Sequence, residues 1–137
     1  MNDLYKKAAE IIKTISYITI ATATKDGTPW NTPVSATFDS SLNFYWGSSH
    51  DAVHSKNILE NSNTFVVVFD SQQPEGTGVG VYMQGNSKQL EKENEDMTKY
   101  SFTPKNIWIN DEAKNEDGKY KHDIRIPLDL DRVIELI

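Results

Sequence analysis

The chain contains no cysteine among its 137 residues, which excludes disulfide bonds and thiolate metal sites. Its apolar runs are much shorter than the roughly 20 residues that span a bilayer as a helix. The N-terminal segment does not show the charge, apolar run and cleavage site of a secretory signal. The formal net charge of -6 argues against nucleic acid and anionic membranes as partners, because both favour a basic surface. We therefore expect a cytoplasmic protein with one domain, residues 1–137.

Arginine is also scarce, which limits how the chain can hold an anion. The two arginines, Arg125 and Arg132, both lie near the C-terminus. An anion bound earlier in the chain therefore depends on lysine, histidine, hydroxyl or backbone N–H groups. The three histidines do not follow a spacing such as H-E-x-x-H, and no hydrolytic triad stands out. We therefore expect no metal site and assign no catalytic residue.

The residues that are present divide the chain into short elements. Apolar residues at helical spacing predict a helix over residues 4–15, and a short helix is expected over 54–62. Runs of β-branched and aromatic residues bounded by turn residues predict strands. The expected strands are 17–23, 31–38, 42–47, 64–69 and 79–90, with strand-like segments in 124–137, and turns at 25–29 and 39–41 join the first three into an antiparallel meander.

The remaining segments complete an α+β chain of about six strands, for which a small, mostly antiparallel barrel is the natural closure. Strand 64–69 is apolar after its first residue, so we expect it to be buried on both faces. Pro127 limits pairing near the C-terminus to an edge or a break. The charged segment 91–100 is expected to be a helix, 107–109 a short apolar stretch, and 70–78 and 110–123 loops.

The segment SSHDAVHSKNILENS, residues 48–62, concentrates polar groups where a helix is expected to begin. The first turn of a helix has unpaired N–H groups and the positive end of the helix dipole, which together favour anions such as phosphate. Ser48, Ser49 and Ser55 can donate hydrogen bonds, His54 can donate and carries charge if its pKa is raised, and Lys56 adds a positive charge. The alternative is that Ser55 caps the helix while His54 and Lys56 are only solvated.

Two further segments each allow two interpretations. In PWNTPVSATF, residues 29–38, Pro33 has no N–H and restricts the strand to an edge or an interruption. Spare backbone groups on that strand can pair with the edge of a planar heterocycle, or the prolines simply protect a sheet edge. In GTGVGVYMQG, residues 76–85, the lysine of a phosphate loop is missing. Its glycines indicate close approach to a flat ligand, or a hairpin with bulges.

Together, four segments resemble the FMN-binding split barrels of the pyridoxamine 5′-phosphate oxidase-like family. They are TPVSATFD, LNFYWGSS, HSKNILENSNTFVVVFD and GVGVYMQGNSKQLE, within residues 15–92. The resemblance implies a six-stranded, mostly antiparallel split β-barrel with flanking helices. It also implies a homodimer that binds FMN between its subunits.

The resemblance further implies which residues bind the cofactor. Asn31, Thr32, Pro33 and Val34 would meet the isoalloxazine ring, with Tyr45 and Trp46 lining its pocket and Gly80 beneath it. Ser48, Ser49, His54, Ser55 and Lys56 would hold the FMN phosphate.

The function implied is that of a flavin-dependent oxidoreductase with a small-molecule redox substrate and NAD(P)H as a candidate electron donor. Because the C-terminal DRVIELI departs from the family's arginine-bearing substrate segment, we expect a substrate other than pyridoxamine 5′-phosphate. Trp30 and Trp108 would wall the substrate side or pack in the core. The alternative is a non-catalytic flavin- or haem-binding protein, with His50, His54 or His122 as an axial ligand; a deazaflavin fits this acidic chain less well.

Overall fold

The structure is a computed structural model that describes residues 2–74, 78–114 and 120–137, with the backbone alone for 111–114 and 120–123. The helices are α1 (Asn2–Thr14), α2 (Val53–Glu60) and α3 (Leu130–Ile134). The strands are β1 (Tyr17–Ala23), β2 (Pro29–Ser35), β3 (Thr37–Phe38), β4 (Phe44–Ser48), β5 (Asn63–Phe69), β6 (Gly80–Lys92), β7 (Thr98–Lys114) and β8 (Tyr120–Leu128).

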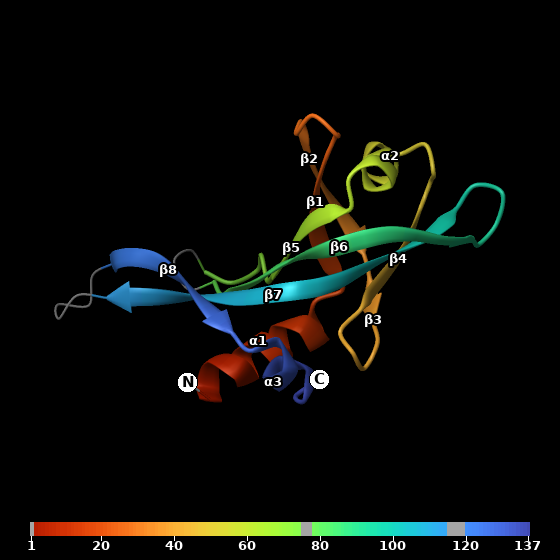
Figure 1. The fold of residues 1–137 in the computed structure, drawn as a ribbon. Coiled ribbons are helices and arrows are strands. Elements are labelled where there is room, and N and C mark those ends of the chain that lie inside the picture. The colour runs from red at the N-terminus through yellow and green to blue at the C-terminus, as the bar shows by residue number, and fades with distance from the viewer. Residues whose placement is uncertain (1, 75–77, 115–119) are drawn as a thin grey trace.

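The eight strands form one sheet in which all neighbouring strands are antiparallel (Figure 1). The hydrogen-bonded order is β2-β1-β5-β6-β7-β4-β3, and β8 pairs with the second half of β7. β2 and β3 are the two ends of this order, yet they follow each other in the chain with Ala36 between them. The sheet therefore curls until its ends meet at Ala36. No ladder among the described strands joins β2 to β3, so the curled sheet is not closed.

The structure has eight strands where the sequence predicted six, and one reason is a bend in the second strand. The predicted strand 31–38 is divided into β2 and β3 at Ala36. The N–H of Ala36 donates to the carbonyl of Ser16 at 2.9 Å, outside the regular ladder. The meander itself is confirmed, since β1 pairs with β2 and β3 pairs with β4.

A long hairpin of β7 and β8 is the second reason. The predicted stretch 107–109 lies inside β7, which has 17 residues, and much of the predicted loop 110–123 belongs to β7 or β8. Residues 115–119 of that loop lie outside the described residues. Polar and charged residues suit an exposed strand as well as a loop, so composition alone did not reveal the pairing.

The prediction of a helix over residues 91–100 is wrong. β6 continues to Lys92 and β7 begins at Thr98, and the two strands form a hairpin. In the turn between them, the side chain of Asn94 accepts the N–H groups of Asp96 and Met97, both at 2.9 Å. A charged segment fits a solvated helix or a solvated hairpin, and here the pairing of β6 with β7 determines the outcome.

The C-terminal segment contains a helix that the sequence did not predict. The side chain of Asp129 accepts the N–H of Asp131 at 3.0 Å and so caps α3, which buries Val133 completely. The guanidinium of Arg132 lies 4.1 Å from the centre of the Tyr5 ring, which ties α3 to α1. Pro127 lies in β8, which pairs with β7 alone among the described strands, so the edge position predicted for it is confirmed.

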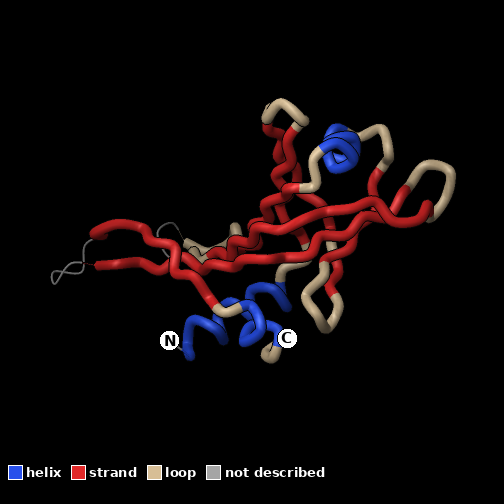
Figure 2. Tube along the Cα trace, in the orientation of Figure 1, coloured by secondary structure: helices blue, strands red, loops and turns tan. Residues whose placement is uncertain are grey.

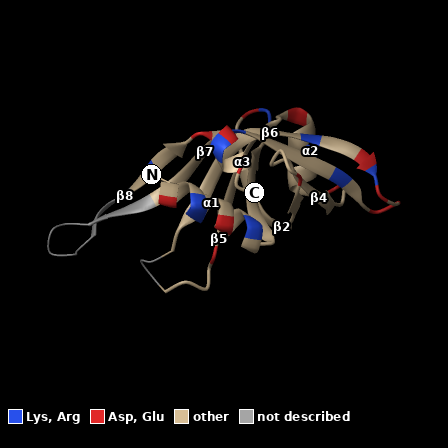
Figure 3. Ribbon diagram, turned by 90° about the horizontal axis from the view of Figure 1, so that it is seen from below, with Lys and Arg blue, Asp and Glu red and all other residues tan. Residues whose placement is uncertain are grey.

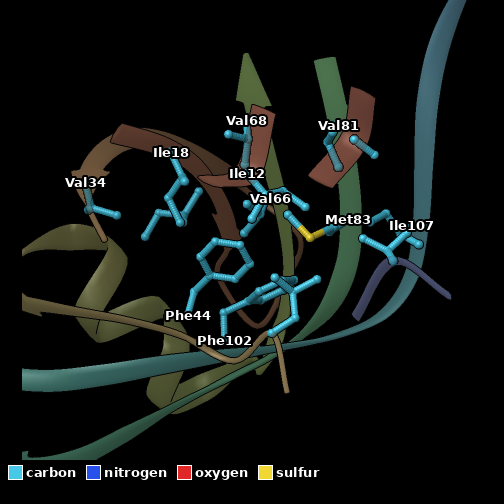
Figure 4. Packing of buried hydrophobic residues seen from close by; sticks show 14 of the residues in the cluster. Ile12, Ile18, Val34, Phe44, Val66, Val68, Val81, Met83, Phe102 and Ile107 are labelled. Carbon is cyan, nitrogen blue, oxygen red and sulfur yellow. The ribbon is translucent and has the colours of Figure 1, made fainter. Parts of the chain in front are cut away.

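The apolar core fills the inner side of the curled sheet (Figure 4). Side chains from β1, β5, β6 and β7 alternate inward, and Ile20, Val66 and Met83 among them are completely buried. α1 and α3 lie together below the sheet, whereas α2 lies at its other end (Figure 2). Ile12 of α1 and Ile58 of α2 join the core from these two sides.

The outer side of the sheet is less buried than the sequence predicted. β5 was expected to be buried on both faces, but its burial alternates, and Phe69 is 47% exposed. Phe65, which is partly buried, stacks on Trp108 with ring centres 6.1 Å apart. The apolar character of β5 therefore leaves one face of the sheet partly open to solvent.

Two glycines have the roles that the sequence suggested. Gly27 has a φ of 94°, which fits the predicted turn. Gly85 marks a shift of register between β6 and β7, and a Cβ there would lie 2.0 Å from the carbonyl oxygen of Thr103. Close backbone approach at a bulge therefore explains Gly85 without a ligand.

Candidate functional site

The start of α2 is an open helix N-terminus. Its N-cap residue is Ala52, which offers no side-chain hydrogen bond, and the first turn contains no acidic residue. The first intrahelical bond runs from the N–H of Lys56 to the carbonyl of Ala52. The N–H groups of Val53, His54 and Ser55 precede it and have no intrahelical acceptor. The capping role considered for Ser55 is therefore wrong. Of these donors, the N–H of Val53, a residue that is 44% exposed, is the most open to an anion.

His54 and Ser48 form a buried pair at this helix end. The Nε2 atom of His54 lies 2.9 Å from the Oγ atom of Ser48, and each residue is 8% exposed. Burial lowers the pKa of His54 below its ordinary value of 6.5, because the charged imidazolium loses solvation. The condition under which His54 would carry charge, a raised pKa, is therefore not met in this state, and the neutral form of His54 is favoured.

The other members of the predicted cradle divide into one buried and two exposed residues. Ser55 is completely buried, and its Oγ atom has no hydrogen-bond partner among the described residues. Lys56 is exposed in the first turn of α2, and Ser49 is exposed just before the helix. The Oγ atom of Ser49 accepts the N–H of Asp51 at 3.2 Å. The structure thus brings Ser48, Ser49, His54, Ser55 and Lys56 to one end of α2.

Few local charges act on this site. Asp51 precedes the helix, and the Nε2 atom of His50 lies 3.6 Å from its carboxylate. Elsewhere, basic and acidic residues lie interspersed, as along α1 and the β6–β7 hairpin (Figure 3). Positive potential at the start of α2 therefore comes mainly from the helix end and from Lys56.

Asn57 is a site residue that the sequence reasoning missed. It is 5% exposed, and its Nδ2 atom donates to the Oγ1 atom of Thr22 on β1 at 3.1 Å. Residues 54, 55, 57 and 58 are the buried positions of α2. A polar residue on the buried face of a short helix was the signal that could have revealed this contact.

The predicted ring-binding segment lies on β2, an edge strand next to α2. β2 pairs only with β1 in the described sheet, so its other edge keeps free backbone groups. Thr32 and Val34 pair with the inward residues Ile20 and Ile18, whereas Asn31 and Pro33 lie on the outer face. Val34 is buried in the core, so only its backbone is accessible to a ring.

The sheet separates Tyr45 and Trp46, which the sequence placed in one pocket. Trp46 points inward, is 3% exposed and stacks on Tyr100 with ring centres 6.2 Å apart. Tyr45 points to the opposite face, where its hydroxyl donates to the Oδ2 atom of Asp39 at 2.8 Å. This hydrogen bond to a carboxylate raises the pKa of Tyr45. Trp46 shares the face of Ser48, whereas Tyr45 does not.

Gly80 lies far from the start of α2 within one chain. It begins β6 and pairs with Phe69, at the end of β5 that is remote from α2. Seven residues of strand, about 20 Å, separate it from the α2 end of the sheet. Its N–H donates to the side chain of Asn110, which in turn donates to the carbonyl of Gly78 at 3.3 Å.

The comparisons with known proteins agree with this architecture. The family described as pyridoxamine 5′-phosphate oxidase matches residues 4–126. The chain belongs to the pyridoxamine 5′-phosphate oxidase family. No curated protein matches it. In the part of the chain that the structure describes, no helix is long and apolar enough to cross a membrane, and no group of three metal-ligating side chains occurs.

Solved structures with this fold include both oxidase-related and haem-binding proteins. A Clostridium acetobutylicum protein related to general stress protein 26, of the pyridoxinephosphate oxidase family, is 12% identical; the match covers 97% of this chain and 99% of that one, with a TM-score of 0.71. A haem-binding protein from Mycobacterium smegmatis is 14% identical, with 96% and 60% covered and a TM-score of 0.74. The Vibrio cholerae haem storage protein HutZ is 13% identical, with 70% and 86% covered and a TM-score of 0.62. These identities support the fold alone, and the chain spans only 60% of the mycobacterial protein.

The buried His54 predicts a specific loss of stability in acid. Because its pKa is lowered in the folded state, the unfolded chain binds a proton more readily below about pH 6.5. The contribution of His54 to the free energy of unfolding is therefore complete above that pH and falls as the pH decreases. We expect urea unfolding between about pH 7.5 and 5 to show a smaller decrease for His54→Gln than for the wild type. Equal decreases would contradict a neutral, buried His54, because the two proteins share every other titratable group.

Proposed function

We propose that the chain is an FMN-binding flavoprotein and that it acts as an oxidoreductase. The observation that carries this proposal is the uncapped first turn of α2, with the His54–Ser48 pair and the unpartnered Ser55 hydroxyl beside it. Backbone N–H groups at a helix start bind phosphate well, and hydroxyls add donors without the need for arginine. The terminal phosphate of FMN supplies a matching dianion.

The position of β2 supports binding of the flavin ring next to this phosphate site. β2 and α2 pack against each other, and the free edge of β2 offers backbone donors and acceptors. The edge of an isoalloxazine ring carries alternating acceptors and donors, which such an edge can pair with. Trp30 is on β2, faces the same side as Thr22 beside α2, and is 47% exposed. Its exposed indole is suited to cover one side of the ring.

The bound flavin would supply the redox chemistry, and the chain would supply orientation and exclusion of water. This division of roles between flavin and protein fits a site without an acid–base triad. The redox substrate is a small molecule, with NAD(P)H as the candidate electron donor. A cytoplasmic location and one domain over residues 1–137 remain predictions from the sequence.

The outer face of the sheet supports a homodimer. Two rows of uncharged side chains cross five strands there, and the guanidinium of Arg125 on β8 lies 4.2 Å from the centre of the Tyr82 ring in one of them. One row contains Pro33, Thr19, Val67, Tyr82 and Trp108, and the next contains Asn31, Ala21, Phe65, Gln84 and Asn106. Tyr17 and Phe69, on the same side, are 65% and 47% exposed. A partly apolar face of this extent, with one arginine stacked on a tyrosine, is typical of an interface, and we propose that a second copy covers it, with FMN between the subunits.

Haem is the second candidate ligand, because two proteins of the same fold are described as binding or storing it. His54 is a poor axial ligand, since it is buried and its Nε2 atom is engaged by Ser48. The side chain of His122 lies outside the described residues. His50, whose side chain is 49% exposed, is the better candidate, and a haem site would therefore lie on the loop before α2.

The cofactor is tested by the absorption spectrum of the purified protein and the mass of the ligand released from it. We expect flavin bands near ~450 nm and the mass of FMN, either as isolated or after incubation with added FMN. A Soret band near ~400 nm after incubation with haem, without uptake of FMN, would favour the second candidate and contradict the first.

The dimer is tested by sedimentation of Phe69→Glu. A charge on the proposed interface, at the exposed end of β5, should convert the dimer to a monomer of 15.5 kDa and weaken FMN binding. Leu59→Glu is the matched control, because Leu59 is 64% exposed on α2 and its replacement should leave the dimer intact. A wild-type monomer that binds FMN fully would contradict the proposed interface.

A further inference from the structure

The contact between His54 and Ser48 joins two elements of the site through one atom pair. Ser48 is the last residue of β4, and His54 is the second residue of α2. The atoms in contact are the Nε2 of His54 and the Oγ of Ser48, 2.9 Å apart. Because both residues are buried, solvent does not compete for this hydrogen bond.

We propose that His54 is a positioning residue that acts on the cofactor phosphate through Ser48. In this arrangement the Nε2–H of a neutral imidazole donates to the Oγ of Ser48, which leaves the hydroxyl proton of Ser48 free to point at a phosphate oxygen. A serine hydroxyl has one proton and two acceptor lone pairs, so it can accept from His54 and donate to an anion at once. This inference rests on the proposed function, since it assigns a role within the same phosphate site.

The geometry argues against His54 as a direct ligand of the phosphate. Its Nε2 atom is already engaged by the Oγ atom of Ser48, 2.9 Å away. The described residues around the ring provide no carboxylate that would hold it in the charged form. Burial also favours the neutral form of the ring, since it lowers the pKa of His54. An uncharged relay therefore fits the surroundings better than an imidazolium that contacts the anion.

The experiment compares FMN with riboflavin, which lacks the phosphate, on four variants. Dissociation constants are measured by flavin fluorescence for His54→Ala, Ser48→Ala, the double variant and His54→Gln. We expect His54→Ala and Ser48→Ala each to weaken FMN binding about tenfold, the value for the loss of one good hydrogen bond, and to leave riboflavin binding unchanged. The double variant should be no weaker than either single one, because both remove the same hydrogen bond to phosphate.

His54→Gln is the control that separates positioning from bulk packing. The Nε2 amide of glutamine can replace the Nε2–H of histidine as a donor to Ser48, but it cannot carry a charge. We expect it to retain most of the FMN affinity. If His54→Ala fails to fold, as judged by circular dichroism, His54→Asn takes its place, because the shorter amide does not reach Ser48.

Three results would overturn the relay. Additive losses of about a hundredfold in the double variant would mean that His54 contacts the phosphate independently. Equal losses for FMN and riboflavin would mean that His54 only supports the fold. Full FMN affinity in Ser48→Ala would exclude Ser48 as the link. A wild-type protein that does not prefer FMN to riboflavin would instead contradict the phosphate site itself, and the relay with it.

Discussion

The hydrogen bonds that fasten α2 to the end of the sheet are the constraint on which the site depends. His54 contacts Ser48 on β4, Asn57 donates to Thr22 on β1, and Asn61 donates to the carbonyl of Thr24. A short helix with three polar contacts to two parts of the sheet keeps its direction without a cap. Its first-turn N–H groups can then remain unpaired, and the cost of leaving them so can be recovered when an anion binds.

The two faces of the sheet have different surroundings. The inner face carries the core and is completed by α1, α3 and α2 (Figure 4). The outer face carries two rows of uncharged side chains, with Arg125 stacked on Tyr82 and the exposed Tyr17 and Phe69 beside the rows, and no helix of the described residues covers it. In a dimer formed through that face, Gly80 and Trp108, which lie far from α2 of their own chain, would be placed nearer to the interface. Such a dimer would explain how residues that one subunit keeps apart can belong to one site in the assembly.

The sequence predicted the elements whose signals are local. The helix at the N-terminus, β1, β5, β6 and the position of α2 follow from periodicity and turn residues. The hairpin at Asn94 did not, because its charged residues fit a solvated helix as well as a solvated hairpin. The division at Ala36 did not, because a contact with Ser16, distant in the chain, accompanies it. In the site, residue types indicated that polar side chains gather at the start of α2, but not how these side chains are arranged. Tertiary structure determines which hydroxyl is buried and which ring nitrogen is engaged. It also places Tyr45 and Trp46 on opposite faces of the sheet.

The most direct test of the central claim is hydrogen exchange of the backbone amides of Val53, His54 and Ser55, followed by NMR on the labelled protein. These amides have no intrahelical acceptor, and the amide of Val53, a residue that is 44% exposed, should exchange rapidly in the free protein. Saturation with FMN should slow their exchange and shift their resonances, whereas riboflavin should leave them largely unchanged. If the two ligands give the same response at these three amides, or if FMN protects only amides elsewhere, the phosphate does not bind at the start of α2.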